Sequence, residues 1–358
     1  SSFSLSGSLG GFSNVTITTA TNSASGASPE TPNSIRFNAP KQYASQNRAV
    51  TPNDYASKVK SIYANAKSVS VWGGEDNDTP FYGRVYISIK PVSGATLTEV
   101  QKTDIINQLK EFNVASITPI ITDPETTSAQ LNVSVKYDAK ATTKTADSIK
   151  ALVSSAITSF NTNNLQEFDS IFRHSKFIET INKVDPSILS NITTVKLHKP
   201  FTATTTGSTT YTVSFNNALY NPHSGHNASG GGVLVSSGFK INGDATNEYF
   251  LDEDGAGNVR LYYLVGTTRT YSNSTQGTID YTNGIITLNS LHITSVSNVD
   301  GATSTAVRLT VIPSSVDVIP VRNQVLEIDE TNTTVSVSAD TYDTTSGIGY
   351  TSATSYAS

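Results

Sequence analysis

The sequence predicts an α+β chain followed by a mainly β region: first α+β modules with helices packed on sheets in two layers, then a β-sandwich or barrel-like domain. Three observations predict this fold class. Apolar residues recur at helical spacing only between about residues 46 and 200. Beyond Pro200, short alternating segments are separated by Gly, Asn and Asp turns. The chain has 358 residues, more than one hydrophobic core normally serves.

The amino-acid composition argues against several classes of protein function. Hydrophobic residues make up 36% of the chain and Ser, Thr and Asn are abundant, as in strand-rich proteins with polar faces. The net charge of −5 argues against a nucleic-acid-binding surface, and the apolar runs are far shorter than a membrane helix needs. Without cysteine there is no disulfide framework and no thiolate metal site, which fits a reducing compartment. We therefore expect no cofactor and neither nucleic acid nor membrane as a partner.

The N-terminal 45 residues are rich in Ser, Thr, Gly and Asn, which predicts an extended arm with one short strand at "NVTITTAT". The chain begins with Ser and contains no Met. We expect that an N-terminal part precedes it in the complete protein.

The first helix is predicted in "AVTPNDYASKVKSIYANA". Thr51 suits the N-cap, Pro52 the first turn, and Asp54 the third position, where its charge meets free N–H groups. The apolar residues that follow at helical spacing are Tyr55, Val59, Ile62 and Ala66.

The stretch "VWGGEDNDTPFYGRVYISIKP", from Val71 to Pro91, contains the only tryptophan of the chain. It predicts a hairpin in which one strand ends at Trp72 and "GGEDNDTP" forms an acidic turn. Val85, Ile87 and Ile89 alternate with polar residues and form the inward row of the return strand. An active-site or metal loop is the alternative, but Glu75 and its neighbouring acids are too close in sequence to face one another across a cleft.

Five further elements complete the α+β part. "TLTEVQKTDIINQLKEF" predicts a helix with a capping box of Thr96 and Glu99. "VASITPIIT" and "QLNVSVKYD" predict a strand pair joined by a turn at Asp123 and Pro124. "TADSIKALVSSAITSF" is an amphipathic helix through Ile149, Leu152, Val153, Ile157 and Phe160, and a shorter helix in "FDSIFRHSKFIETINKV" ends before Pro186.

The β region contains the strand-like segments "TYTVSF", "GGVLVSSGFKI", "VRLYYLV", "GTIDY", "GIITLNSL" and "AVRLTVIP". From about Thr331 the chain becomes Ser/Thr-rich, which predicts a peripheral strand or a loose tail. The expected domains are an arm (1–45), an α+β module (46–125), a second α+β module (126–200), the β domain (201–330) and the tail (331–358).

The most metal-like segment is "FLDEDGAGNVRLYY". Counted from Asp252 as the first position of a calcium loop, Asp254 and Gly257 match, but Ala256 and Tyr263 stand where the fifth and twelfth ligands belong. Two ligands leave most of a cation's shell unfilled, so a β-turn is favoured over a metal site.

No other pattern predicts catalysis. His223 and His226 lie in a Gly-rich loop without further zinc ligands, which favours a solvated loop. The remaining histidines, His174, His198 and His292, stand singly and are more often surface or packing residues. The chain has no GxSxG elbow, no Walker lysine and no dinucleotide fingerprint, so we expect no enzyme and no catalytic residue.

Several ordered segments together carry a family resemblance: "IRFNAPKQYASQNRAVTPNDYASKV", the predicted hairpin, "LTEVQKTDIINQLKEF", "DEDGAGNVRLYYL", "GTIDYTNGIITL" and "IPSSVDVIPVRNQVLEID". Over about residues 30 to 330 the chain resembles the baseplate wedge subunit family, gene product six, of T-even-type contractile-tail phages. Residues 130–200 look like the final α+β module of the wider baseplate J-like group. The resemblance implies a structural virion protein of the tail baseplate, assembled in the host cytoplasm. It also implies dimers linked into a ring around the hub, other wedge proteins and the sheath initiator as partners, and a change of conformation that triggers sheath contraction.

Contact-forming residues are expected where an arginine adjoins an apolar anchor, because arginine is enriched at interfaces. The segments "RAVTPNDY" and "SSVDVIPVRNQVLEI" have this pattern. The predicted contact residues are Arg48, Val50, Tyr55, Trp72, Val321 and Arg322. Ion pairing within the chain is the alternative for the two arginines. The alternative function is a carbohydrate-binding or hydrolysing tail or surface protein that uses Trp72, the tyrosines of "LYYL" and the acids at 75–78 or 252–254.

Overall fold

The computed structural model describes residues 31–44, 46–77, 79–114, 116–226 and 232–340. Contacts divide the chain into two compact units, Ser1–Pro124 and Glu125–Ser358. Each unit has its own hydrophobic core, so each is described by itself. The expected strand in "NVTITTAT" lies outside the described residues.

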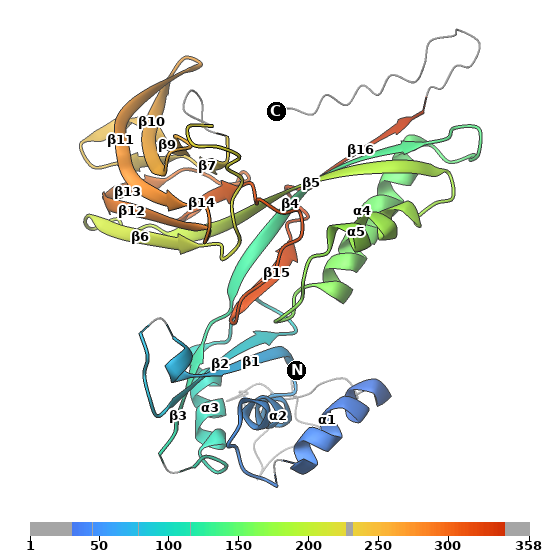
Figure 1. The fold of residues 1–358 in the computed structure, drawn as a ribbon, viewed down its shortest axis with the longest axis vertical. Coiled ribbons are helices and arrows are strands. Elements are labelled where there is room, and N and C mark those ends of the chain that lie inside the picture. The colour runs from blue at the N-terminus through green and yellow to red at the C-terminus, as the bar shows by residue number, and fades with distance from the viewer. Residues whose placement is uncertain (1–30, 45, 78, 115, 227–231, 341–358) are drawn as a thin grey trace, which may run out of the picture. The chain divides into compact units, whose positions relative to one another are not determined.

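The first unit packs helices on a three-stranded sheet (Figure 1). Its elements are α1 (Pro32–Ala44), α2 (Pro52–Ile62), β1 (Ala66–Gly73), the 3₁₀ turn η1 (Gly74–Asp76), β2 (Arg84–Pro91), α3 (Glu99–Leu109) and β3 (Thr118–Thr122). β2 lies in the middle, antiparallel to β1 and parallel to β3. The core consists of Ala49, Tyr55, Val59, Ile87, Ile89, Leu97, Ile105 and Leu109.

The hairpin predicted for residues 71–91 is confirmed. β1 and β2 pair antiparallel with Trp72 opposite Tyr86. Ile87 and Ile89 are buried as the inward row, and Val85 at the strand entrance is partly buried. The turn between the strands begins with η1, whose Gly74 carbonyl accepts the N–H of Phe81 at 2.9 Å.

The two glycines of this turn differ in the room around them, which makes a matched pair of variants. A Cβ on Gly74 would lie 2.0 Å from the backbone oxygen of Phe81, whereas a Cβ on Gly73 meets only the mobile end of Glu75. We expect Gly74→Ala to lower the free energy of unfolding of the first unit by about 1–3 kcal/mol and Gly73→Ala to be nearly neutral. Denaturant unfolding followed by Trp72 fluorescence measures both, and equal losses would contradict the steric explanation.

The N-terminal cap of α2 matches the sequence prediction, whereas that of α3 differs from it. Thr51 and Asp54 form a capping box on α2, as expected. The predicted box of Thr96 and Glu99 is wrong, because α3 begins at Glu99 and its N-cap is Thr98, with Gln101 as the reciprocal partner. The same cap chemistry is therefore present two residues further along the chain.

Residues 32–44 form helix α1 where an extended arm was expected. Pro32 occupies the first helical position, and the Thr31 hydroxyl accepts the N–H of Ser34 at 3.2 Å. The helix contacts α2, which explains how a segment with few regularly spaced apolar residues is helical.

In its described residues, the second unit contains two helices, α4 (Ala146–Asn164) and α5 (His174–Asn182). Its first sheet has the order β15–β4–β5–β14–β7 with β16 beside β4, and its second has the order β13–β8–β9–β10–β11–β12–β6. The strands of the first sheet are β4 (Glu125–Tyr137), β5 (Ile188–Thr202), β7 (Leu234–Ser236), β14 (Ala306–Val311), β15 (Gln324–Ile328) and β16 (Thr334–Ala339). The strands of the second are β6 (Thr209–Ser214), β8 (Phe239–Ile241), β9 (Asp244–Glu253), β10 (Asn258–Val265), β11 (Thr268–Asp280), β12 (Ile285–Leu291) and β13 (Ile293–Val296).

The predicted pairing of "VASITPIIT" with "QLNVSVKYD" is wrong. β3 pairs with β2 in the first unit, whereas β4 pairs with β5, β15 and β16 in the second. Asp123 and Pro124 therefore end one unit instead of closing a hairpin. The expected boundary after residue 200 falls inside β5, whereas β16 agrees with the peripheral strand that was one of the two alternatives for the segment from Thr331.

The core of the second unit is shared by both sheets and both helices. On α4, Ile149, Val153, Ile157 and Phe160 are buried as predicted, but Leu152 is 39% exposed. The predicted fold class is confirmed: α+β elements come first, and strands predominate after α5. Among the described residues, no helix has both the length and the apolar character that crossing a membrane requires.

Candidate functional site

The predicted contact residues of "RAVTPNDY" occupy the approach to α2. Val50 is 50% exposed, and the guanidinium of Arg48 donates to Gln46 Oε1 at 3.2 Å. Tyr55 is fully buried in the first core, so the expectation that it forms an external contact is wrong. Its helical spacing with Val59 already placed it on the inward face of α2.

Aromatic side chains gather at the turn end of the β1–β2 hairpin. Trp72 stacks on Tyr86 with ring centroids 5.8 Å apart, and its indole N–H donates to Asn77 Oδ1 at 2.9 Å. Phe81 is 44% exposed and Tyr82 is 82% exposed. Exposed aromatic side chains are typical of interface anchors, so Trp72 lies beside a candidate contact surface.

The segment from Ile312 to Arg322 is held from two sides. Val318 exchanges two backbone hydrogen bonds with Phe172, both 3.0 Å long, and Ile319 exchanges two with the side-chain amide of Asn217. Asp317 pairs with Arg173 at 3.0 Å.

This anchoring leaves three aliphatic side chains outward: Val316, Ile319 and Val321 are 47%, 49% and 41% exposed. Arg322 follows them with a φ of 48°, a left-handed conformation that is uncommon outside glycine. Of the six predicted contact residues, four belong to the first unit and two to the second.

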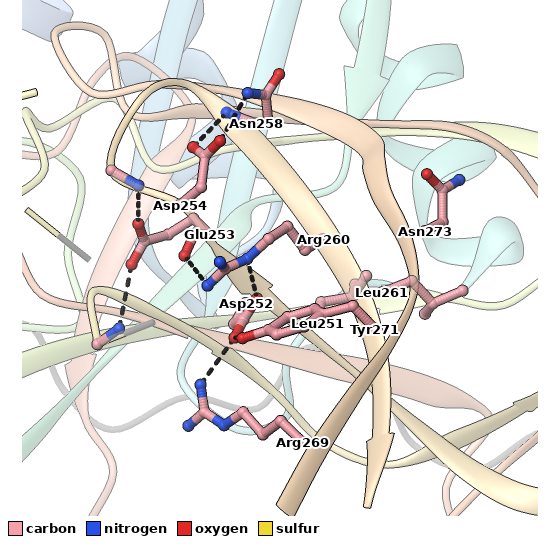
Figure 2. A network of polar contacts seen from close by, with 12 residues as sticks. Leu251, Asp252, Glu253, Asp254, Asn258, Arg260, Leu261, Arg269, Tyr271 and Asn273 are labelled. Atoms are coloured by element: carbon pink, nitrogen blue, oxygen red, sulfur yellow. Dashed lines mark hydrogen bonds and ion pairs between the residues drawn. The ribbon is translucent and has the colours of Figure 1, made fainter. Parts of the chain in front are cut away.

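The acidic loop "FLDEDGAGNVRLYY" is a turn between β9 and β10, as favoured from the sequence (Figure 2). Asp252 is 1% exposed and accepts from Arg260 Nε at 2.9 Å, Arg269 Nη1 at 2.7 Å and the Tyr271 hydroxyl at 2.9 Å. Asp254 caps the turn by accepting the N–H groups of Ala256 and Asn258. The carboxylates of this turn are thus bound to protein donors.

Glu253 lies between these two acids and is completely buried. Its carboxylate accepts the backbone N–H groups of Gly232, Val233 and Gly255 and the Tyr281 hydroxyl. Burial and the adjacent Glu253 carboxylate raise the pKa of Tyr281. The three consecutive acids therefore join β9, β10, β11 and the Val233 segment into one structure.

No group of residues is placed to hold a metal ion in the described part of the chain. His223 and His226 lie side by side, with Nε2 and Nδ1 3.4 Å apart, and no group of three or more His, Asp or Glu there is placed to hold a metal ion. Of the aromatic side chains proposed as sugar platforms, Tyr262 is buried, Tyr263 is half-buried, and Trp72 is covered on one face by Tyr86.

A polar cluster that the sequence did not predict lies around His198 on β5. His198 is buried, its Nε2 is 2.7 Å from Asp329 Oδ2, and its Nδ1 has no partner. Asn332 donates to both Asp329 and Asp300, and Asp300 pairs with Arg308. The cluster borders a hollow of about 600 Å³. Sequence alone could not find it, because His198 and Asp329 are 131 residues apart.

His198 makes the stability of the second unit depend on pH. Burial lowers its pKa from the ordinary 6.5, more strongly than the bond to Asp329 raises it. At pH values between the lowered pKa of folded His198 and the ordinary pKa of the unfolded chain, the unfolded chain binds more protons than the folded chain. The free energy of unfolding therefore falls as pH decreases below about 6.5.

We expect His198→Gln, which keeps a donor for Asp329 but cannot titrate, to reduce this loss of stability on acidification. Urea unfolding at pH 7.5 and at lower pH measures this loss, with half-buried His292→Gln as the matched control. An unchanged pH dependence in His198→Gln would contradict the assignment.

Two parts of the chain are similar to known proteins. Residues 51–122 match the model for the baseplate structural protein gp6, C-terminal domain I, and residues 129–200 match the model for its C-terminal domain III. The baseplate wedge protein gp6 of Enterobacteria phage T4 is 29% identical over 172 residues. The chain resembles gp6 baseplate wedge proteins. The resemblance predicted from the sequence is therefore confirmed.

The gp6 similarity covers 48% of this chain and 26% of the T4 protein, so the chain spans about a quarter of that relative's length. Among solved structures, a cryo-EM structure of the anti-feeding prophage baseplate, 6-fold symmetrised, is 13% identical with a TM-score of 0.34. The matched region covers 46% of this chain and 37% of the chain in the prophage baseplate structure. The gp6 domain I match spans α2 to β3, and the domain III match spans most of β4 to most of β5.

Proposed function

We propose that the chain is a structural subunit of a phage tail baseplate wedge. The observation that carries this proposal is the match of two gp6 domains in their order along the chain. The chain associates with itself as dimers that link into a ring around the hub, and it binds other wedge proteins and the sheath initiator. The ring changes conformation to trigger sheath contraction. The subunit acts in the virion tail baseplate after assembly in the host cytoplasm.

Two features of the surface support an assembly role. The 312–322 segment presents Val316, Ile319 and Val321 on a backbone that is already fixed, so little conformational entropy is lost on binding. The hairpin end presents Phe81 and Tyr82 beside Arg84, whose guanidinium lies 5.0 Å from the Phe81 ring centre. Aromatic and arginine side chains contribute much of the binding energy at protein interfaces.

Sedimentation velocity over a wide concentration range tests the self-association. We expect dimers or higher species in reversible equilibrium with monomer. A strict monomer at the highest concentration would contradict self-association of this chain. Addition of purified wedge proteins then tests the other partners, and co-sedimentation is the expected result.

A further inference from the structure

Strand β16 lies at an edge of the first sheet of the second unit (Figure 1). It pairs in parallel with β4, from Thr334 opposite Asn132 to Ala339 opposite Tyr137. In the part of the chain that the structure describes, β16 has no strand on its other side. Alternate N–H and C=O groups along six residues therefore face outward and can accept another strand.

Some other sheet edges of this unit are short or partly occupied, although β5 and β11 each have a stretch that is paired on one side only. The outer edge of β15 is occupied by the segment before α5, since Gln166 N–H donates to Leu326 O at 2.8 Å and Phe168 bridges to Val325. β7 and β13 have three and four residues, too few for an extended pairing. On β6, the Ser214 carbonyl already accepts from Lys199 at 2.7 Å. β16 is longer than β7 and β13, and no described strand lies on its outer side.

The residues of β16 also lack the usual protection of an edge. Natural edge strands carry Lys, Pro, inward charges or bulges that prevent pairing with another chain. The sequence "TVSVSA" has none of these, and its register with β4 is continuous. Val335 and Val337 pack partly on the core, while Thr334, Ser336 and Ser338 are exposed on the opposite face.

This pattern fits a second copy of the same strand. A two-fold axis perpendicular to the sheet makes two equivalent strands antiparallel and keeps their faces aligned. Val335 and Val337 then meet the valines of the other copy on the helix-covered face, and the hydroxyl side chains meet on the open face. Because β16 is uncharged, no like charges lie opposite each other, and Asp340 stands beyond the strand end.

We propose that β16 pairs antiparallel with β16 of a second copy, about a two-fold axis near Ser336 and Val337. The strand pair joins the two sheets into one continuous sheet. This inference rests on the proposed function, because it names the contact by which the baseplate subunit associates with itself.

A cysteine scan of residues 334–339 tests the geometry. The chain contains no cysteine, so each introduced thiol can form a disulfide only with its counterpart in another copy. Residues directly opposite in antiparallel strands have Cα atoms about 4.5–5.5 Å apart, within disulfide reach. We expect covalent dimers to peak at Ser336→Cys or Val337→Cys and to fall towards both strand ends. Exposed Ser190→Cys on β5, two strands away, is the control and should not cross-link.

Charge variants give an independent test that leaves the core unchanged. Ser336→Lys and Ser336→Asp each bring like charges together near the axis and should weaken self-association about tenfold. Mixing the two variants should restore dimers, now of mixed composition, whereas Ser190→Lys should behave as wild type. Circular dichroism checks that each variant is folded.

The outcomes separate the two proposals. A dimeric wild-type chain without cross-linking at any β16 position overturns the β16 contact and leaves self-association standing. Equal cross-linking at every position also overturns it, because antiparallel strands oppose equivalent residues at one point only. A chain that stays monomeric at all concentrations overturns both.

Discussion

Replacing Asp252 by Ala is expected to lower the free energy of unfolding of the second unit by about 3–5 kcal/mol. Asp252 is 1% exposed and forms ion pairs with two arginines, of which Arg260 is itself 7% exposed. Without the carboxylate, the Arg260 guanidinium stays buried against the Tyr271 ring, 4.4 Å from its centre, with no anionic partner at Asp252. Removal of one partner from a buried ion pair is among the most destabilising changes that one substitution can cause.

Two probes distinguish the units in this experiment. The single tryptophan lies in the first unit, so its fluorescence follows that unit, whereas far-UV circular dichroism follows both. We expect Asp252→Ala to shift the dichroism transition to lower denaturant and to leave the fluorescence transition in place. Asp280→Ala is the matched control, because Asp280 is an exposed acid that only caps a turn in the same sheet. Equal shifts of the dichroism transition for the two variants would show that the buried ion pairs of Asp252 stabilise the unit no more than an exposed turn cap does.

Replacing Phe172 by Ala should cost a similar amount, about 3–5 kcal/mol, through loss of packing. Phe172 is fully buried, and its ring centre lies 6.1 Å from that of Phe160 and 5.6 Å from that of Phe177. Its removal leaves a cavity between α4 and α5. Phe172→Leu keeps most of the apolar volume and should lose much less stability.

The Phe172 variant should also loosen the 312–322 segment. Two backbone hydrogen bonds join Phe172 to Val318, so the cavity lies directly beside that anchor. Hydrogen exchange measures the effect, with faster exchange expected at the Val318 amide and little change in β10. Unchanged exchange at Val318 would mean that its other contacts, through Asp317 and Ile319, hold the segment by themselves.

Local features of the fold could be predicted from sequence because they depend on neighbouring residues. The capping box of Thr51, the β1–β2 hairpin and the buried face of α4 all follow from spacing within one element. Errors arose where a partner comes from elsewhere in the chain. β4 was assigned to the preceding strand, although its partners are β5, β15 and β16, the last two from the far end of the chain.

The candidate contact residues also divide into those that local sequence identifies and those whose exposure depends on distant parts of the chain. The sequence pattern identified Val50 and Val321, which are exposed, but also Tyr55, whose burial depends on the packing of α2 on its sheet. It did not identify Ile319 or Val316, because their exposure follows from the anchoring of Val318 between them. The edge of β16 could not be predicted either, since an open edge is defined by the strand order of the whole sheet.

The parallel pairing of β4 with β15 and β16 has a consequence for synthesis of the chain. Thr334 and Asn132 bond across the sheet although they are 202 residues apart. When β4 leaves the ribosome, β5 follows within about sixty residues, but the opposite edge of β4 stays open until almost the whole second unit has been translated. Such distant contacts slow folding and leave strand edges available for aggregation meanwhile. The first unit can therefore fold during translation, whereas the second completes its sheet only after residue 339 has emerged.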